Sequence, residues 1–471
     1  MSKRVRPISP KCRRHGVVLV VALIVTAVLA ALVFALGRTM RVEMDTSGNV
    51  AASTQARSIE LAAEQYVQAM LTTGVNQGES VMDMPEDQWE NIRVGQQGSG
   101  GFFYIVRPNY DDQSLPLFGL VEEGAKININ STGTAQTQLD DLFNGNTDLS
   151  DALVAWRSTS AGGDTYYQSL GANSYQCKQA PLETVEELLM VRGFTREMLY
   201  GDGTAPALGQ RSNIVTAQSN SLGGNLVLSD AQIARGIYDL VTVYSKDPTL
   251  APDGTQIIPV SNKNGLRTLL STMLSQSRAS EIMRGFPGRN APTSIFDLYF
   301  RGGMNETELD QVANYIGPAA GANGAAAVVH IDVNQAPPAV LYSLVGLNGI
   351  QQTDIDTLLA QRQTQVPQSG ALAWVADALG NGAATRLGRY INGQSQQYSA
   401  DIHAFTDNGR GFKRFRIVVD MSSGSPVVLY RRDITDRPDP MDYQVLESLK
   451  AGQGPGIAND SGAFSTGGGI R

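Results

Sequence analysis

The sequence predicts an α+β protein with a long N-terminal helix, an antiparallel sheet, and a large, mainly helical insertion that interrupts the sheet. Three observations carry this prediction. An uncharged apolar stretch near the N-terminus continues into an amphipathic pattern. Strand-like segments lie at both ends of the remaining chain, and helix-like patterns fill the region between them.

The composition is that of a globular protein with an acidic body. The chain has 471 residues, of which 42% are hydrophobic and 17% charged, so it can bury at least one large core. Its net charge is −8, yet the first 16 residues carry bases and no acid: Lys3, Arg4, Arg6, Lys11, Arg13 and Arg14. An acidic body repels nucleic acid, so we expect no nucleic-acid partner and interpret the basic cluster as a signal for membrane orientation.

Residues 17–37 are apolar and uncharged. At about 1.5 Å per residue they span roughly 30 Å, the thickness of a bilayer's hydrocarbon core. The bases before them predict that residues 1–16 stay in the cytoplasm and that the rest is exported. A cleaved secretory signal would need small residues after the apolar stretch, whereas Gly37 is followed by Arg38 and Thr39.

A small residue precedes the apolar stretch instead. Gly16 directly follows Arg13, Arg14 and His15, and cleavage after Gly16 would keep the hydrophobic helix and start the mature chain at Val17. A basic leader that ends in glycine before a hydrophobic helix resembles those of type IV prepilins and pseudopilins. The resemblance implies that a prepilin peptidase cuts after Gly16 and methylates the new N-terminus at Val17.

One position departs from this family's usual pattern. Most members carry glutamate at the fifth mature position, where it pairs with the N-terminal amine of a neighbouring subunit, but this sequence has Val21. An unpaired carboxylate inside a bilayer costs roughly 3 kcal/mol, so a subunit with no neighbour above it has no use for one. Lack of this glutamate is characteristic of the K-type minor pseudopilin, the subunit proposed for the tip of the type II secretion pseudopilus.

The helical pattern continues beyond the apolar stretch. After Arg38, apolar residues recur at a spacing of three and four: Ala52, Ala56, Ile59, Ala63, Val67 and Met70. Gly74 is a natural stop. We therefore expect one helix over residues 17–74, its first half (17–37) in lipid and its second half packed on a domain.

The remaining chain divides by pattern into three parts. A pilin-like β domain is expected from residues 80–127 together with 395–435, a helical insertion from 128–394, and a flexible tail from 436–471. The expected strands are 102–106, 117–121, 399–406, 411–420 and 427–431, and the clearest expected helices are 182–190, 265–284, 294–316 and 351–363. The K-type pseudopilin has a pilin fold interrupted by a large helical domain, so the resemblance covers nearly the whole chain and implies an insertion of the SAM-like or helix-hairpin-helix type.

A short phrase recurs within the insertion. Residues 127–132, 258–262 and 331–336 each resemble a short strand followed by an Asx, Ser or Thr cap and a leucine-bearing helix. Two glycine turns, Arg192-Gly193-Phe194 and Val345-Gly346-Leu347, resemble the helix-hairpin-helix turns that bind DNA phosphates elsewhere. Acidic residues flank both turns, so we expect them to serve as scaffold.

Candidate ligand and catalytic residues are few. Acidic groups that could donate oxygens to calcium follow no EF-hand spacing: Asp111-Asp112, Glu122-Glu123, Asp140-Asp141 and Asp433/Asp436/Asp439. Some K-type pseudopilins bind calcium, so the resemblance implies a structural calcium ion with ligands that the sequence does not assign. Trp156, Tyr166 and Tyr167 with Asp148 and Asp151 could suggest a sugar-cleaving site, but the aromatic residues are expected to be core and no catalytic constellation is evident.

These observations predict a non-enzymatic minor pseudopilin of the type II secretion system. It would sit in the bacterial inner membrane with one span and most of its chain in the periplasm. Its expected partners are the other minor pseudopilins, the major pseudopilin, the prepilin peptidase, the inner-membrane secretion platform and the membrane itself. Three alternatives stay open: a minor type IV pilin, an unprocessed single-pass protein, and a secreted carbohydrate-active enzyme cleaved near Gly37.

Overall fold

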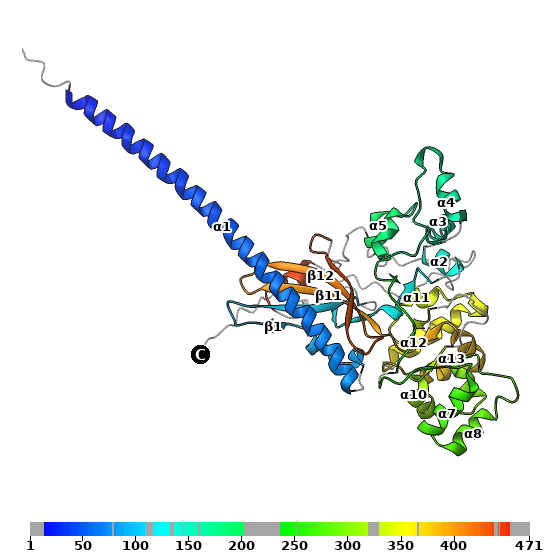
Figure 1. Cartoon of the computed structure of the whole chain (residues 1–471). Coiled ribbons are helices and arrows are strands. Elements are labelled where there is room, and N and C mark those ends of the chain that lie inside the picture. The colour runs from blue at the N-terminus through cyan, green and yellow to red at the C-terminus, as the bar shows by residue number, and fades with distance from the viewer. Residues whose placement is uncertain are drawn as a thin grey trace, which may run out of the picture.

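The structure is a computed structural model. It describes residues 14–77, 80–109, 116–131, 136–143, 145–158, 161–201, 236–251, 253–318, 329–364, 367–437, 441 and 443–452. Most of the predicted leader, residues 1–13, lies outside this set. The fold has the predicted α+β class, with a long apolar N-terminal helix and an antiparallel sheet (Figure 1).

Helix α1 (Arg14–Gln77) is one continuous helix that projects far beyond the body (Figure 1). The helix was predicted over residues 17–74, so the bounds were close. It continues past Gly74 and ends at Gln77. One face of its second half is buried at five of the six predicted positions, and Leu71 takes the place of Met70: Ala52, Ala56, Ile59, Ala63, Val67 and Leu71.

The large sheet joins strands from both ends of the chain. Its order is β1-β2-β11-β12-β13, all neighbours are antiparallel, and two short strands pair at its edges, β3 with β2 and β4 with β11. The strands are β1 (Ile92–Val94), β2 (Gly101–Arg107), β3 (Leu117–Phe118), β4 (Val121–Glu122), β11 (Gln397–Thr406), β12 (Phe412–Asp420) and β13 (Val427–Asp433). The central pairing of β2 with β11 therefore closes only after the whole insertion has been spanned.

The strands over 101–107 and 397–433 follow the predicted segments closely, but the segment predicted over 117–121 is divided. Gly119 has a φ of 139°, in a region that side-chain-bearing residues rarely adopt. The chain turns there, so that Phe118 pairs with β2 and Val121 with β11.

The sheet is covered on both faces. Phe103 points toward α1, where its ring centre lies 5.5 Å from that of Tyr66. Phe102 points the other way and stacks on Phe405 with ring centres 5.7 Å apart. Helix α14 (Tyr443–Lys450) lies over this second face, where the Lys450 ammonium is 5.9 Å from the centre of the Phe412 ring.

Helix α14 corrects the prediction of a flexible tail over 436–471. Val445 and Leu449 are buried in the core of the sheet. They lie four residues apart, one turn of helix, so both reach the same face. The Gly/Ser/Pro-rich composition beyond this helix concealed the short amphipathic segment, and residues 453–471 lie outside the described set.

The insertion consists of three units, each opened and closed by a short parallel strand pair. The pairs are β5 (Ile127–Asn128) with β6 (Val241–Thr242), β7 (Ile258–Pro259) with β8 (Ile316–Gly317), and β9 (Ile331–Asp332) with β10 (Ile391–Asn392). The opening strands are the three predicted phrases, so the predicted repeat is confirmed. Strand β5 belongs to the insertion, although residue 127 was assigned to the β domain, because its partner is β6.

The opening strand of each unit leads into an Asx side chain that accepts a backbone hydrogen bond. Asn128 accepts from the Asn130 amide at 2.8 Å, and Asp332 accepts from the Asn334 amide at 2.9 Å. Asn262 caps a helix by accepting from the Gly265 amide at 3.1 Å. These bonds satisfy amides that the turn out of a strand leaves free.

Short helices fill each unit. The first holds α2 (Gln136–Leu142), α3 (Thr147–Arg157), α4 (Ala161–Gln168), η4 (Gly171–Asn173), η5 (Val185–Met190) and α5 (Arg196–Tyr200). The second holds α7 (Lys263–Met273), α8 (Gln276–Met283), α9 (Ile295–Phe300) and α10 (Glu306–Ala313). The third holds α11 (Pro338–Tyr342), η7 (Leu347–Gly349), α12 (Gln352–Thr364) and α13 (Ala373–Leu387), while η1 (Val81–Asp83), η2 (Glu86–Gln88) and η3 (Glu123–Ala125) lie outside the units.

Two long predicted helices are divided by local signals. The segment 265–284 splits into α7 and α8 because Ser275 caps a new helix by accepting from the Arg278 amide. The segment 294–316 splits into α9 and α10, and Gly303 between them has a φ of 66°.

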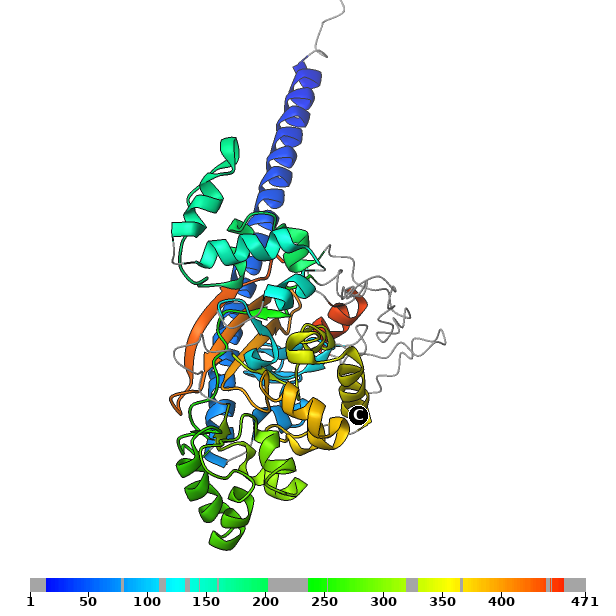
Figure 2. The same cartoon turned by 90° about the vertical axis from the view of Figure 1, so that its right-hand side faces the viewer.

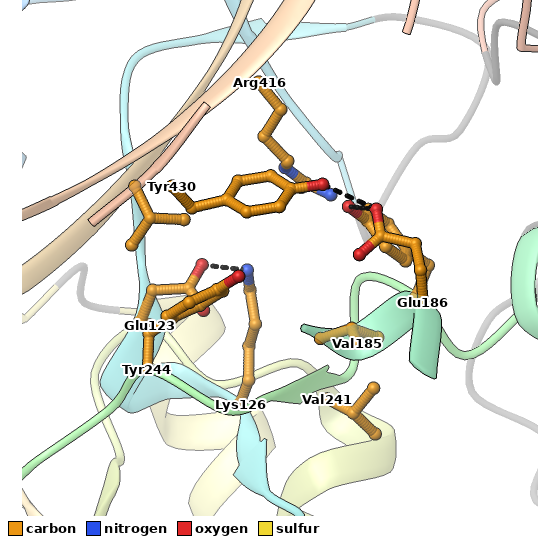
Figure 3. A pocket seen from close by; sticks show the side chains of 10 residues that line it. Glu123, Lys126, Val185, Glu186, Val241, Tyr244, Arg416 and Tyr430 are labelled. Atoms are coloured by element: carbon orange, nitrogen blue, oxygen red, sulfur yellow. Dashed lines mark hydrogen bonds and ion pairs between the residues drawn. The ribbon is translucent and has the colours of Figure 1, made fainter. Parts of the chain in front are cut away.

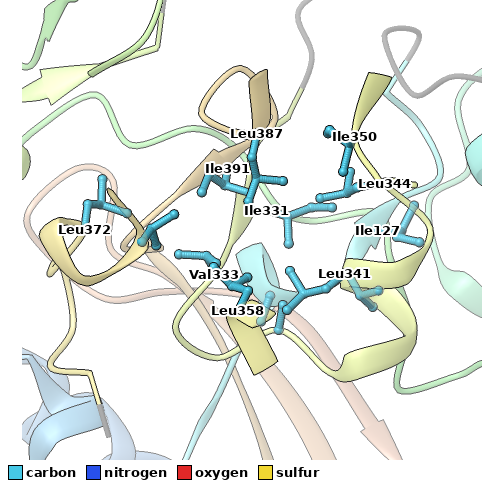
Figure 4. Packing of buried hydrophobic residues seen from close by; sticks show 14 of the residues in the cluster. Ile127, Ile331, Val333, Leu341, Leu344, Ile350, Leu358, Leu372, Leu387 and Ile391 are labelled. Atoms are coloured by element: carbon cyan, nitrogen blue, oxygen red, sulfur yellow. The ribbon is translucent and has the colours of Figure 1, made fainter. Parts of the chain in front are cut away.

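The sheet and the insertion have separate apolar cores. One cluster joins α1, the sheet and α14, and the other runs through all three units of the insertion. Figure 4 shows the second cluster where Ile127 of the first unit approaches Ile331, Leu341 and Leu344 of the third. Figure 1 shows the insertion to the right of the sheet, with the bare part of α1 projecting to the upper left, and Figure 2 shows the molecule from the side of the insertion.

Candidate functional regions: the bare helix and the sheet–insertion junction

The first half of α1 has no protein contacts. Its large apolar side chains between residues 17 and 37 are all exposed, from Val25 at 50% to Phe34 at 76%. Among the described residues, α1 is the one helix that is long and apolar enough to cross a membrane, and none of its apolar stretch is buried in the protein. Leaving this much apolar surface in water is unfavourable, so the stretch needs lipid or a partner.

The predicted processing residues lie at the start of this helix. Gly16 and Val17 fall in the first turn of α1, which begins at Arg14. Val17 is 64% exposed, and Val21, one turn later, is 53% exposed. Cleavage after Gly16 and N-methylation of Val17 stay predictions.

A bare stalk follows the apolar stretch. The first buried residue of α1 in the described part of the chain is Ala52, but the body already reaches the helix near Gly48, where an added Cβ would lie 3.1 Å from the Arg410 guanidinium. Residues 38–47 therefore stand clear of the body, and at about 1.5 Å per residue this stalk is roughly 15 Å long. It combines charged residues with exposed apolar ones, among them Met40, Val42 and Met44. A helix surface of this kind suits packing against other helices outside the bilayer.

The junction between the sheet and the first unit of the insertion is a narrow pocket lined by charged and aromatic side chains (Figure 3). Lys126 forms an ion pair with Glu123, and both side chains are 3% exposed. Thr242 of the first unit also donates to Glu123, and the Lys126 ammonium lies 3.3 Å from the hydroxyl oxygen of Ser399 on β11. Burial acts to raise the pKa of Glu123, but the charge of Lys126 and the hydrogen bonds from Lys126, Thr242 and Ser399 together outweigh burial and hold this pKa below its usual value.

Glu186 is the second centre of this pocket. One of its carboxylate oxygens accepts from the hydroxyl of Tyr430 at 2.6 Å and from that of Tyr238 at 3.1 Å. The guanidinium of Arg437 donates to the same oxygen at 3.1 Å, and that of Arg432 lies 3.3 Å away. Glu186 belongs to the first unit, whereas Tyr430 and Arg432 belong to β13. The negative charge of the insertion is thus matched by donors from the sheet.

A buried arginine completes the contact. Arg416 on β12 donates to Asp239 at 2.8 Å and stacks over the Tyr238 ring at 4.7 Å from its centre. Charge-assisted hydrogen bonds and cation–π contacts gain strength in a dry environment, but removing one partner leaves a costly buried charge. The arrangement is suited to fixing the orientation of the first unit. No sequence pattern predicted this charged junction, because the residues that pair in it lie up to about 250 positions apart in the chain.

The metal prediction finds no ligand set in the described part of the chain. No group of three His, Cys, Asp or Glu side chains there lies close enough to hold an ion. Asp111, Asp112 and Asp439 lie outside the described residues. The calcium ion implied by the resemblance therefore stays a prediction without assigned ligands.

The two glycine turns are packing elements. Gly193 and Gly346 have φ values of 88° and 86°, which explains why glycine stands there. Phe194 is buried, and its ring centre is 5.1 Å from that of Phe143. A side chain at Gly193 would meet Leu149 at 2.8 Å.

The aromatic cluster near α3 is core, as predicted. Trp156 is 5% exposed and Tyr167 0% exposed, with ring centres 5.4 Å apart. The Tyr167 hydroxyl donates to the carbonyl oxygen of Ala152 at 2.7 Å, and the Trp156 indole donates to Glu187 at 2.9 Å. Both polar groups are thus used within the fold.

Comparison with protein-family models gives no match, and comparison with curated proteins gives none either. Among solved structures, a similar chain is found in the crystal structure of the GspK-GspI-GspJ complex from the enterotoxigenic Escherichia coli Type 2 Secretion System. The match covers 84% of this chain and 98% of that chain, at 10% sequence identity and a TM-score of 0.33.

Proposed function

We propose that this chain is a membrane-anchored minor pseudopilin, the K-type subunit that sits at the tip of a type II secretion pseudopilus. The observation that carries the proposal is α1. An uninterrupted helix begins beside a basic, glycine-ended leader, stays bare over the length of a bilayer and of a stalk, and only then packs on a sheet. A plain anchor needs neither the leader glycine nor a rigid continuation of the helix into the body.

Residues 17–37 would lie in the inner membrane and the body in the periplasm. The stalk would pack against the corresponding helices of other pseudopilins. Val21 would place this subunit where no neighbour's N-terminal amine needs a carboxylate. The chain would act by assembly rather than by catalysis, since its buried charges are engaged in holding the insertion on the sheet.

The test is processing of the full chain in cells that also produce its prepilin peptidase. Gly16→Leu places a bulky side chain at the predicted cleavage site and should leave the leader in place. Gly37→Leu is the matched control, because Gly37 lies in the same helix and an added Cβ meets nothing within 4 Å. Intact-mass and N-terminal analysis should find an N-methylated Val17 in the unmodified protein and in the control, and residues 1–16 retained in Gly16→Leu.

Two results would refute the proposal. A mature chain that starts at Val17 in Gly16→Leu would remove the role of the glycine. An unmodified protein that keeps residues 1–16 beside an active peptidase would indicate an unprocessed single-pass anchor.

A further inference from the structure

A second contact between the sheet and the insertion is made by two acids. Glu122 ends β4 of the sheet, Asp332 ends β9 of the third unit, and their carboxyl groups face each other within hydrogen-bonding reach. Glu122 is 1% exposed and Asp332 is 0% exposed. The pair thus lies inside the protein, between two parts of the chain that have separate apolar cores.

The pair lacks the donors that buried carboxylates normally have. In the described part of the chain, neither oxygen of Glu122 nor Oδ2 of Asp332 has a hydrogen-bond donor in good geometry, although the amide of Ser395 faces Glu122. Oδ1 of Asp332 is satisfied by the Asn334 amide. Two ionised carboxylates at this distance would repel each other in a medium that screens them poorly.

The neighbouring elements place charge of both signs around the pair. Asp83 on η1 adds negative charge, and Tyr398, the register partner of Glu122 on β11, is half-buried and donates to the carbonyl oxygen of Ser395 at 2.8 Å. The guanidinium of Arg362 on α12 donates to the carbonyl oxygens of Val333 and Ala336 at 3.0 and 2.7 Å, and its positive charge acts to lower the pKa of Asp332, but burial outweighs this charge. Glu123, one residue after Glu122, has its own cation in Lys126.

We propose that Glu122 and Asp332 hold one proton between them and form a pH-sensitive latch that fixes the third unit of the insertion to the sheet. A shared proton supplies the missing donor and removes the repulsion. This inference is independent of the proposed function.

The direction of the pH dependence follows from the pair's surroundings. Burial, and after it the charge of Asp332, raises the pKa of Glu122 well above its usual range, and burial also raises the pKa of Asp332. An acid with a raised pKa binds its proton more tightly in the folded chain than in the unfolded one. Its contribution to stability is complete below the unfolded pKa and is lost as the pH rises through the folded pKa. The contact between Glu122 and Asp332 is therefore most stabilising at acid pH and least stabilising at alkaline pH.

The test compares the unfolding temperature of the full chain in detergent micelles between about pH 5 and about pH 8. Between these two pH values the pair should lower the unfolding temperature of the unmodified protein by roughly 2 °C or more. Glu122→Gln keeps the shape and supplies a permanent donor, so it should flatten this dependence and melt higher than the unmodified protein at about pH 8. Asp87→Asn on η2, which removes one exposed acid, is the charge-matched control and should behave like the unmodified protein.

The infrared spectrum of the unmodified protein gives a second readout that does not depend on a variant that folds. A protonated-carboxyl band should persist at neutral pH. Loss of that band, or a Glu122→Gln variant that melts lower than the unmodified protein at about pH 8, would overturn the proposal. Calcium chloride that stabilises the unmodified protein but not Glu122→Gln at that pH would also overturn it and would assign the pair to a cation.

Discussion

The two halves of α1 share one backbone and have opposite surroundings. From Ala52 onward, one face of the helix is buried against β2, β11 and β12, with Ala56 and Ala63 fully enclosed. Before Ala52, no large apolar side chain between residues 17 and 50 is buried. The first half of the helix therefore has no stabilising contacts within the described part of this chain. In our proposal, lipid covers it as far as residue 37 and other helices cover it beyond that residue.

The same substitution in each half of α1 should give very different losses of unfolding free energy. Ile59 is 2% exposed in the packed half, and Ile24 is 56% exposed in the bare half. Ile59→Ala should cost about 2–5 kcal/mol of unfolding free energy, because it opens a cavity between α1 and the sheet. Ile24→Ala should change the stability of the body by less than about 0.5 kcal/mol. Denaturant unfolding in detergent micelles measures both, and equal effects would contradict the contrast.

A smaller loss of unfolding free energy is expected when an ion pair between the sheet and the packed half of α1 is removed. Arg431 on β13 lies 3.0 Å from Glu60 and 3.1 Å from Glu64, and the Glu60 side chain is 4% exposed. Arg431→Met should cost about 1–3 kcal/mol, since it leaves the Glu60 carboxylate buried without its cation. Arg57→Met is the control, because Arg57 is an exposed arginine on α1, the helix that carries Glu60. A loss as large in the control would mean that net charge, rather than the contact, is responsible.

The smallest effect concerns the bare half in a membrane. Val21→Glu should reduce the fraction of the chain that resists alkaline extraction from membranes, at a cost of about 1–2 kcal/mol, because position 21 lies near the end of the apolar stretch. Val42→Glu, in the stalk, should have no such effect. If Val21→Glu inserts normally and improves secretion, the subunit has a neighbour whose amine the carboxylate can pair with, and the tip position is wrong.

The elements that sequence reasoning found are those encoded locally. The three- and four-residue spacing predicted the buried face of α1, and the strand-then-Asx phrase predicted β5, β7 and β9. Their partners β6, β8 and β10 were missed, since each is two residues long and is defined only by a strand that lies far away in the sequence. Helix α14 was missed because it is short and is followed by a Gly/Ser-rich stretch, whose composition dominated the prediction for residues 436–471.

The junction groups were beyond sequence reasoning for a different reason. Glu122 and Glu123 are adjacent in the sequence and were grouped there only as possible oxygen donors to calcium. The structure buries both and gives them different partners, Asp332 for the first and Lys126 for the second. Adjacent residues of a chain that leaves a strand point in different directions, so charge patterning alone cannot separate their roles.

The contrast between the apolar stretch and the stalk is tested most directly by applying a water-soluble maleimide to α1 in native membranes. A chain with Cys12→Ser and Cys177→Ser would carry one new cysteine, either Ile24→Cys in the apolar stretch or Met44→Cys in the stalk. The cysteine at position 24 should never react, and the cysteine at position 44 should react only in cells that lack the other pseudopilins. Equal reaction at both positions would contradict this contrast, since the bare half of α1 would then lie in water.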